Sequence, residues 1–486
     1  MSLTTALSIA QTALLNTSRQ TSIVSRNISE ANNPDYARRS AAIVTSMNGS
    51  HITQIRRATS EVLFRQNLAA LSSVVGQDTM LGAMNSLNLA VNGSDNATSP
   101  ARLIGKFQEA LQSYSASPSN GSIAENAVEA ARQVVKALNN GTTAIQSFRS
   151  DMDRQILGAV GELNSLLSDF EQVNREIVSG TQAGRDVNDA LDQRDALLKK
   201  ISEFVPVSVV PRAANDMALV TASGAMLFDV VPRTVTFDPV AGHSAGVDGN
   251  PIRIDGVPLP AGTGGNTSAS GKLAAMLQMR DDVAGGMQAQ LDETARGLIA
   301  AFSEKDPDGI LADAAGLFTW PGAPAVPADG VLVDGLAGLI SINAAMDSTA
   351  GGNPHLLRDG GANGADYIRN TEGGAGFTSL LIDYQTRLES PIAFDNAAGL
   401  QGTISVVTYS EESVSWFEGI RQSAQRAVEN KNALYVRTDA ALSNMTGVNI
   451  DEELTLLLDL EHSYQASARL MSTVDAMLGA LMDAIR

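Results

Sequence analysis

Apolar residues near the C-terminus recur at alternating steps of three and four positions. The run follows Gly447 and comprises Leu457, Leu460, Tyr464, Ser467, Met471, Val474, Leu478, Leu481 and Ile485. This spacing is the a/d pattern of a coiled-coil helix. Asn449 precedes the run as a candidate N-cap, and the acidic residues after it suit the positive end of a helix. The pattern predicts a C-terminal helix that needs a partner along its apolar side.

The other end of the chain has the same alternation. Its members are Leu3, Leu7, Ala10, Leu14, Thr17, Thr21, Val24 and Ile28. Because two apolar stripes with one period can cover each other, we expect the N- and C-terminal helices to pair as a coiled coil.

Between the ends, turn signals divide the chain into long helices and one β-rich stretch. Asn32, Asn33, Pro34, Asp35 and Tyr36 should end the first helix, and Asn48-Gly49 predicts a hairpin after it. Helical periodicity is predicted over about 60–91, from Ser99-Pro100, over about 122–178, from Gly271 to Phe302, and over about 410–445. In the third of these, Leu163, Leu166, Phe170, Val173 and Ile177 form one apolar side. Short β-like runs fill Val205 to Pro260, and beyond the Pro-rich connection from Pro321 to Pro327 the chain is predicted to be irregular until about Phe377.

These elements predict a mainly α fold with long helices, paired terminal helices and a small inserted antiparallel β unit. A chain of 486 residues is too long for one core. Residues 1–58 are predicted to form one half of an inner coiled-coil domain, with a hairpin, and residues 447–486 its other half. Residues 59–204 and 265–446 are predicted to form a helical domain in two parts, and residues 205–264 a β insert between them.

Composition narrows the possible partners. The 34 basic and 53 acidic residues give a formal net charge of −19, which disfavours nucleic acid and anionic membranes as partners. With no cysteine, the chain has no disulfide or thiol chemistry. We find neither a signal-peptide pattern at the N-terminus nor an apolar run long enough to span a membrane, so no membrane insertion is expected.

A search for chemistry yields no predicted catalytic, cofactor-binding or metal-binding residue. The four histidines are scattered without metal-ligand spacing, and His462 is expected to face solvent. The glycines before Lys272 are spaced one residue too far apart for a phosphate loop, and Leu273 replaces the required hydroxyl. Asp306 begins a calcium-like loop that lacks its glutamate. Asp192 and Asp195 are interpreted as ordinary helix-start acids and surface pairs.

Several motifs resemble those of one protein family. Asn27 to Arg39 resembles the N-terminal signature of bacterial flagellar rod, hook and hook-associated proteins, and Val448 to Glu453 with Tyr464 to Ala468 resembles the C-terminal signature. Inner motifs are similar to the hook-associated members that join hook to filament. They are Leu191 to Asp195, Gly271-Lys272-Leu273, and Ile342-Asn343 followed by Pro354.

The chain departs from the family pattern in two places. Asn33 and Asp35 replace the usual threonine and glycine of the turn, which we expect them to maintain because Asn and Asp tolerate left-handed backbone. The chain is also short for the family, so we expect the outer β domain to be absent or reduced around residues 321–376.

The resemblance implies a structural subunit of the bacterial flagellum, with no enzyme activity and no cofactor. In such proteins the terminal helices pair into an inner tube, and neighbouring subunits cover the apolar surface that one subunit leaves open. Implied partners are further copies, the hook protein, the adjacent hook-associated protein and an export chaperone. Secretion through the flagellar type III apparatus would need no cleaved signal. The alternative is a soluble enzyme or carbohydrate-binding protein with a coiled-coil stem, using the β unit from Val205 to Pro260 as its site.

Overall fold

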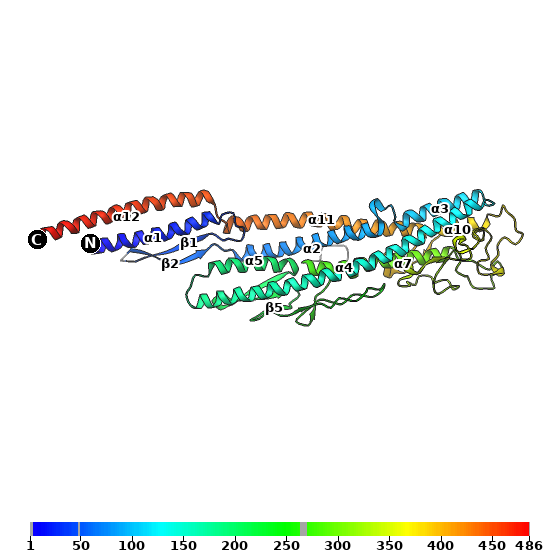
Figure 1. Cartoon of the computed structure of the whole chain (residues 1–486), viewed down its shortest axis with the longest axis horizontal. Coiled ribbons are helices and arrows are strands. Elements are labelled where there is room, and N and C mark those ends of the chain that lie inside the picture. The colour runs from blue at the N-terminus through cyan, green and yellow to red at the C-terminus, as the bar shows by residue number, and fades with distance from the viewer. Residues whose placement is uncertain (1–2, 47–48, 263–269, 486) are drawn as a thin grey trace. The chain divides into compact units, whose positions relative to one another are not determined.

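The structure is a computed structural model, and it describes residues 3–46, 49–262 and 270–485. It is mainly helical, with a few small antiparallel sheets (Figure 1). The predicted fold class is therefore confirmed. The helices are α1 Leu3–Ser29, α2 Glu61–Asn92, α3 Pro100–Ala116, α4 Gly121–Gln182, α5 Asn188–Phe204, α6 Lys272–Leu277, α7 Ala284–Ala301, α8 Leu336–Leu339, α9 Leu356–Asp359, α10 Ser379–Glu389, α11 Val406–Thr446 and α12 Ile450–Ile485.

Six of the strand pairs among the described residues are antiparallel. The strands are β1 Arg39–Ser46, β2 Gly49–Arg57, β3 Val207–Pro211, β4 Met217–Thr221, β5 Met226–Phe228, β6 Val235–Thr236, β7 Arg253–Ile254, β8 Val257–Pro258, β9 Phe318–Thr319, β10 Ser341–Ile342, β11 Ile392–Ala393 and β12 Thr403–Ile404. Strands β1 and β2 form the predicted hairpin, although Asn48 lies outside the described residues. Strands β3 to β8 fall within the predicted β-rich stretch and form two three-stranded sheets.

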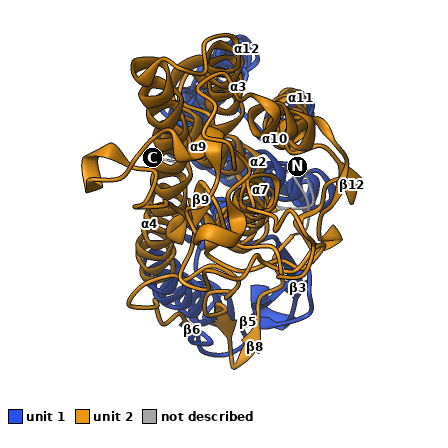
Figure 2. Cartoon of the chain, turned by 90° about the vertical axis from the view of Figure 1, so that its right-hand side faces the viewer, with its two compact units in different colours: residues 1–74, 162–235, 430–486 blue, residues 75–161, 236–429 orange. Residues whose placement is uncertain are grey.

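Two compact units make up the chain (Figure 2). Unit 1 combines residues 1–74, 162–235 and 430–486, and unit 2 combines residues 75–161 and 236–429. Each unit is assembled from segments that are distant in sequence. The boundaries of the two units therefore differ from those of the five ranges expected from the sequence, and the five ranges remain predictions.

In unit 1, the two ends of the chain lie side by side. Helices α1 and α12 contact each other along their lengths, and the β1–β2 hairpin packs against α1 (Figure 1). Elsewhere in the unit, the predicted apolar side of the last turns of α4 is buried, from Leu163 to Ile177. There the ring of Phe170 meets that of Phe228 from β5 edge to face, with centroids 4.9 Å apart. Helix α4 continues through Gly180 to Gln182, beyond the end predicted near Val178.

The core of unit 2 lies around α7. Of the 18 residues of α7, 14 are buried, because α8, α10 and the segment before α11 pack around it. Phe302, which follows α7, lies 5.1 Å from Phe107 of α3 and 4.9 Å from Tyr384 of α10 between ring centroids. Such aromatic packing contributes about 1 kcal/mol per pair beyond the burial of area.

Three details differ from the sequence predictions. Residues 379–389, for which no element was predicted, form α10, and Gln278–Val283 is a π-helical turn within the helix predicted from Gly271 to Phe302. Neither Asn33 nor Asp35 has a positive φ, so the turn that we expected them to maintain forms without left-handed backbone at these positions. A local hydrogen bond from the Asp35 N–H to Asn33 Oδ1 and the ion pair of Asp35 with Lys199 hold it.

Candidate functional site: the junction of the chain ends

The amide of Asn27, in the last turn of α1, is the centre of a buried network in unit 1. Its Oδ1 accepts hydrogen bonds from the Tyr36 hydroxyl at 2.8 Å and from the Arg39 backbone N–H at 3.1 Å. Its Nδ2 donates to the Arg39 carbonyl at 2.9 Å and to the Glu453 carboxylate at 3.0 Å. Since only an amide side chain offers both donors and acceptors in this arrangement, Asn27 can join all three partners at once.

Glu453 is the matching residue on α12. It is fully buried, and its carboxylate accepts from Arg38 Nε at 2.6 Å as well as from Asn27. The backbone N–H of Arg38 also donates to the carbonyl of Thr446, the last residue of α11, at 2.7 Å. The segment after α1 is thus tied to both helices that meet at Gly447.

The turn from Asn32 to Tyr36 is held by local bonds. Asn33 Oδ1 accepts from the Asp35 N–H at 3.1 Å, and Asp35 pairs with Lys199 of α5 at 3.1 Å. Asn32, Asn33, Pro34 and Asp35 are exposed, whereas Tyr36 is buried with the Arg39 guanidinium over its ring at 4.9 Å. Burial raises the pKa of the Tyr36 hydroxyl, so it stays a neutral donor to Asn27.

An ionic cluster attaches the hairpin to α5. Asp192 accepts from Arg39 at 3.0 Å and from Arg57 at 2.9 Å, and Arg57 also pairs with Asp195. The interpretation as a surface pair is wrong for Asp192, which is buried, whereas the side chain of Asp195 is 25% exposed. Burial raises the pKa of the Asp192 carboxyl, and the two guanidinium groups oppose this shift.

Asp189 extends the cluster to α1. Its carboxylate pairs with Arg26 at 2.6 Å and also with Arg39. Although partial burial opposes the shift, hydrogen bonds from Arg26 and Arg39 lower the pKa of Asp189. The hairpin, α1 and α5 are therefore linked through alternating acids and bases around Arg39.

The predicted seam residues are covered to different degrees. Val24, Leu460 and Val474 are buried, while Leu7, Leu14, Ile28, Leu457, Met471 and Leu478 are partly covered. Tyr464 and Leu481 remain 49% and 48% exposed. The side chains of Leu3 and Ile485 lie outside the described residues. Figure 1 shows α12 extending beyond the start of α1, which leaves the end of the seam without a covering helix.

Further apolar side chains on α12 are open to solvent. Leu454, Leu458, Leu470, Met477 and Met482 are 45%, 58%, 48%, 53% and 68% exposed. Leu470, Met477 and Leu481 follow steps of seven and four and so share one side of the helix. Leu454 and Leu458 are four positions apart and lie on another side of the helix, and Leu481 is also a predicted seam residue. We call the exposed surface that these six residues form, on more than one side of α12, its open face.

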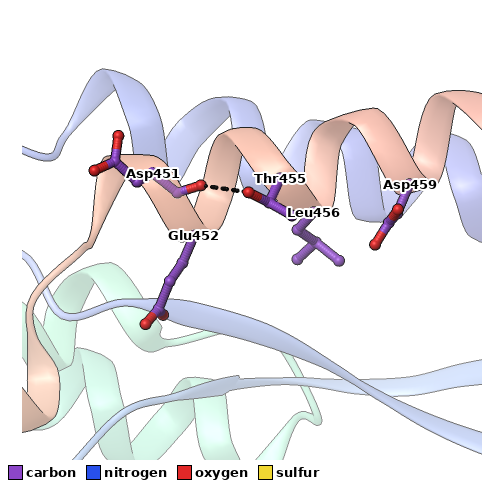
Figure 3. Close-up of a pocket in the computed structure, with 5 residues that line it drawn as sticks. All are labelled: Asp451, Glu452, Thr455, Leu456 and Asp459. Carbon is purple, nitrogen blue, oxygen red and sulfur yellow. Dashed lines mark hydrogen bonds between the residues drawn. The ribbon is translucent and has the colours of Figure 1, made fainter.

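A shallow depression lies over the first turns of α12 (Figure 3). Asp451, Glu452, Thr455, Leu456 and Asp459 line it, and it encloses about 390 Å³. Thr455 Oγ1 donates to the Asp451 carbonyl within the helix at 2.8 Å. The depression is open, and three of its five lining residues are acidic.

The described residues contain no cluster of three or more His, Asp or Glu side chains that could hold a metal ion. In the same part of the chain, no helix has the length and apolarity needed to cross a membrane. His462 is exposed, as the sequence predicted. The polar groups that are buried in unit 1 hold structural elements together.

Glu453 and Asn27 were not among the seam residues predicted from the sequence. The signal for Glu453 was nevertheless present, because it lies four positions before Leu457 and so in phase with the apolar stripe. A polar residue on such a seam fixes the register of paired helices. Asn27 lies three positions after Val24 on the matching side of α1.

Comparison with known proteins assigns the chain to a family. Residues 84–317 match the family described as the flagellar hook-associated protein FlgK helical domain. Residues 441–484, which include Glu453, match the family described as the flagellar basal body rod FlgEFG protein C-terminal. The chain belongs to the FlgK family of flagellar hook-associated proteins. The resemblance inferred from the terminal and inner motifs is thereby confirmed.

Individual FlgK-family relatives match over different lengths. The chain is 22% identical over 470 residues to flagellar hook-associated protein 1 of Bacillus subtilis (strain 168), covering 90% of this chain and 86% of that protein. It is 26% identical over 259 residues to flagellar hook-associated protein 1 of Escherichia coli (strain K12), covering 48% of this chain and 45% of that protein. The solved flagellar hook junction protein FlgK from Burkholderia pseudomallei is 21% identical, with a TM-score of 0.43, covering 53% of this chain and 46% of that one.

Proposed function

We propose that this chain is a non-enzymatic structural subunit of the junction that joins the flagellar hook to the filament. In this function, copies stack through their paired terminal helices, and the partners are further copies, the hook protein and the adjacent hook-associated protein. Export would use a chaperone and the flagellar type III apparatus, and the site of action would be the extracellular flagellum. Family membership supports the flagellar role.

The open face of α12 is the observation that carries the stacking proposal. A surface helix normally turns its apolar residues inward, yet the six apolar side chains of the open face are between 45% and 68% exposed although α12 pairs with α1. Covering these side chains would gain about 1 kcal/mol or more for each one that becomes buried. Further copies of the chain offer the same terminal arm to cover them.

The junction around Asn27 and Glu453 supports the proposal in a second way. It holds α1, the hairpin and α12 in one arrangement, so that the open face is presented in a defined direction. A rigid surface loses less conformational entropy on assembly than a flexible one. The family motif would thus contribute to stacking by preorganising the terminal arm.

The proposal is tested by changing the open face without changing the subunit. The double variant Leu458→Ser and Leu470→Ser should keep the monomer's free energy of unfolding within about 0.5 kcal/mol, since both side chains are about half exposed. It should fail to restore filament attachment in cells whose own hook-filament junction protein is deleted, as measured by electron microscopy. Deletion of residues 1–30 or 450–486 should also abolish incorporation.

A matched control changes exposed polar residues of the same helix. Glu461→Gln with Gln465→Ser should leave filament attachment intact, because these exposed side chains are polar and bond each other, although they lie on the same side of α12 as Leu458. Normal incorporation of a truncated chain, or of the double serine variant, would refute the proposal.

A further inference from the structure

Residues 238–250 of unit 2, which we call the strap, cross the surface without helix or strand between β6 and β7. The strap is mostly exposed, but the side chain of His243 is only 1% exposed because it points inward. Gly249 lies so close to Arg280 that an added Cβ would come within 2.4 Å of the guanidinium carbon. The strap is therefore closely packed on charged residues rather than on an apolar core.

Four charged side chains hold the strap. From α4, Asp153 Oδ2 accepts from the Val240 N–H at 3.0 Å and lies 3.1 Å from His243 Nε2, while Arg149 donates to the carbonyls of Ser244 at 2.9 Å and Val247 at 2.6 Å. From the π-helical turn, Arg280 donates to the Asn250 carbonyl at 2.9 Å. Asp281 accepts from the Gly249 N–H at 3.1 Å.

The cluster beneath the strap is balanced in charge when His243 is neutral. Arg280 pairs with Asp153 at 2.7 Å and with Asp281 at 2.6 Å, and Arg149 pairs with Asp281 at 3.4 Å. Two guanidinium groups thus face two carboxylates. Because an ionised carboxylate only accepts hydrogen bonds, His243 serves as the donor to Asp153 through Nε2–H.

Two further carboxylates lie nearby. The negative charge of Asp248, within the strap, attracts the Arg149 guanidinium. Asp334 packs against the strap at Gly246, where an added Cβ would come within 2.2 Å of the Asp334 carboxylate.

A proton on His243 would place a third positive charge among these buried groups. Burial lowers the pKa of His243 from 6.5, and the Arg149 guanidinium lowers it further, against the opposing effect of Asp153. When the strap is detached, His243 is in water and regains its ordinary pKa. The attached strap thus binds the proton less well than the detached strap. Its stability is complete above about pH 6.5 and falls as the pH decreases towards the lowered pKa.

We propose that residues 238–250 are a proton-sensitive strap: protonation of His243 weakens its attachment to Arg149, Asp153, Arg280 and Asp281. Release of the strap uncovers the guanidinium groups of Arg149 and Arg280. These two groups are 3% and 0% exposed while the strap is attached. Mild acid thus changes a closed surface of unit 2 into one that presents two cations, on a chain with a net charge of −19.

The test is hydrogen–deuterium exchange of the full chain between pH 8 and pH 5, expressed as protection factors so that intrinsic rates cancel. Backbone amides of Val240 and Gly249 donate to the cluster and report on strap opening. Their protection should fall by about tenfold per pH unit below pH 6.5, until the lowered pKa of the attached state is reached. Peptides from α3 should not show this change.

Three variants assign the response. His243→Gln retains a donor at the Nε2 position but cannot be protonated, so its strap should stay protected at pH 5. His355→Gln removes another partly buried histidine of unit 2, one that bonds Tyr114 at 3.0 Å, and should leave the response intact. Asp292→Asn should also leave it intact, although burial raises the pKa of Asp292 to about 7.

Two results would overturn the proposal. One is equal strap protection at pH 8 and pH 5 in the unaltered chain, and the other is an unchanged acid response in His243→Gln. If that variant does not fold, an NMR pH titration of the histidine ring carbons in the unaltered chain decides the question. Substitution of His51, His355 and His462 assigns the remaining signal to His243, and a pKa of 6.5 or higher for that signal would reject the strap.

Discussion

At the scale of single residues, unit 1 depends on polar side chains that are buried only because they are paired. Asn27 uses both its donor and its acceptor atoms, and Glu453 receives one donor from α1 and one from the segment after it. An unpaired buried carboxylate would cost several kcal/mol, so each partner requires the other. This mutual dependence gives the junction one register and one set of neighbours.

Removing the Glu453 carboxylate should therefore destabilise the junction. Glu453→Ala should lower the local free energy of opening by about 2 kcal/mol, because Asn27 loses one acceptor and Arg38 its closest partner. Hydrogen exchange of peptides covering residues 27–46 and 450–460 measures this change. Glu452→Gln is the control, since that exposed carboxylate lies 4.0 Å from Arg38 and should contribute less than about 0.5 kcal/mol. Equal protection in Glu453→Ala and the unaltered chain would contradict the structural role of Glu453.

Residue types alone did not separate buried from exposed charges. Asp192 and Asp195 have the spacing of ordinary helix-start acids, and only the folded chain shows that Arg39 and Arg57 of the hairpin reach them. The sequence separation exceeds 130 residues, at 153 for Arg39 with Asp192 and 135 for Arg57 with Asp192. No local pattern carries information about such a contact.

At the scale of elements, the length of a helix decided whether the sequence could predict it. The helices α2, α4 and α11 are 32, 62 and 41 residues long, and their sequence predictions are confirmed. The helix α10 has 11 residues, and its pattern is too short to stand out from the glycine-rich sequence before it. Its helical form depends on packing of Leu380, Leu381, Tyr384 and Leu388, which are buried.

Helix α12 begins where its capping residue predicts. Asn449 Oδ1 accepts from the backbone N–H of Asp451 at 3.1 Å and of Glu452 at 3.4 Å. Asn449→Ala should raise the hydrogen-exchange rate of the first turn of α12 about fivefold, equivalent to about 1 kcal/mol. Asn449→Asp keeps an acceptor at the same position and should preserve the protection. A first turn that exchanges equally in all three proteins would show that tertiary contacts, rather than the cap, set the start of the helix.

At the scale of the whole molecule, the two chain ends in unit 1 depend on each other for burial of their apolar sides. Helix α1 packs between α12 and the hairpin, so it depends on both. Ala10 and Val24 of α1 are 1% and 2% exposed in the paired arrangement. Without α12, the apolar side of α1 would face water, and a lone helix of its length is marginal.

Deletion of residues 450–486 should consequently loosen the N-terminal arm as well. We expect backbone amides of residues 5–29 to lose at least about tenfold of their protection, while amides of residues 100–160 in unit 2 keep theirs. Hydrogen exchange of the truncated and full chains makes the comparison directly. Retained protection of α1 in the truncated chain would mean that the hairpin alone stabilises it.

The sequence by itself determined the mainly α class, the long helices, the hairpin and the two matching terminal stripes, because each of these depends on a period or a turn signal within one segment. It also carried the motifs from which the family was inferred, and the comparisons confirm that family. Only the tertiary structure decided which motif residues are buried, that Asn27 and Glu453 meet across 426 positions, and that His243 is enclosed by two arginines and two aspartates. These contacts join distant segments, and the free energy of a buried polar group depends on partners that no local pattern specifies.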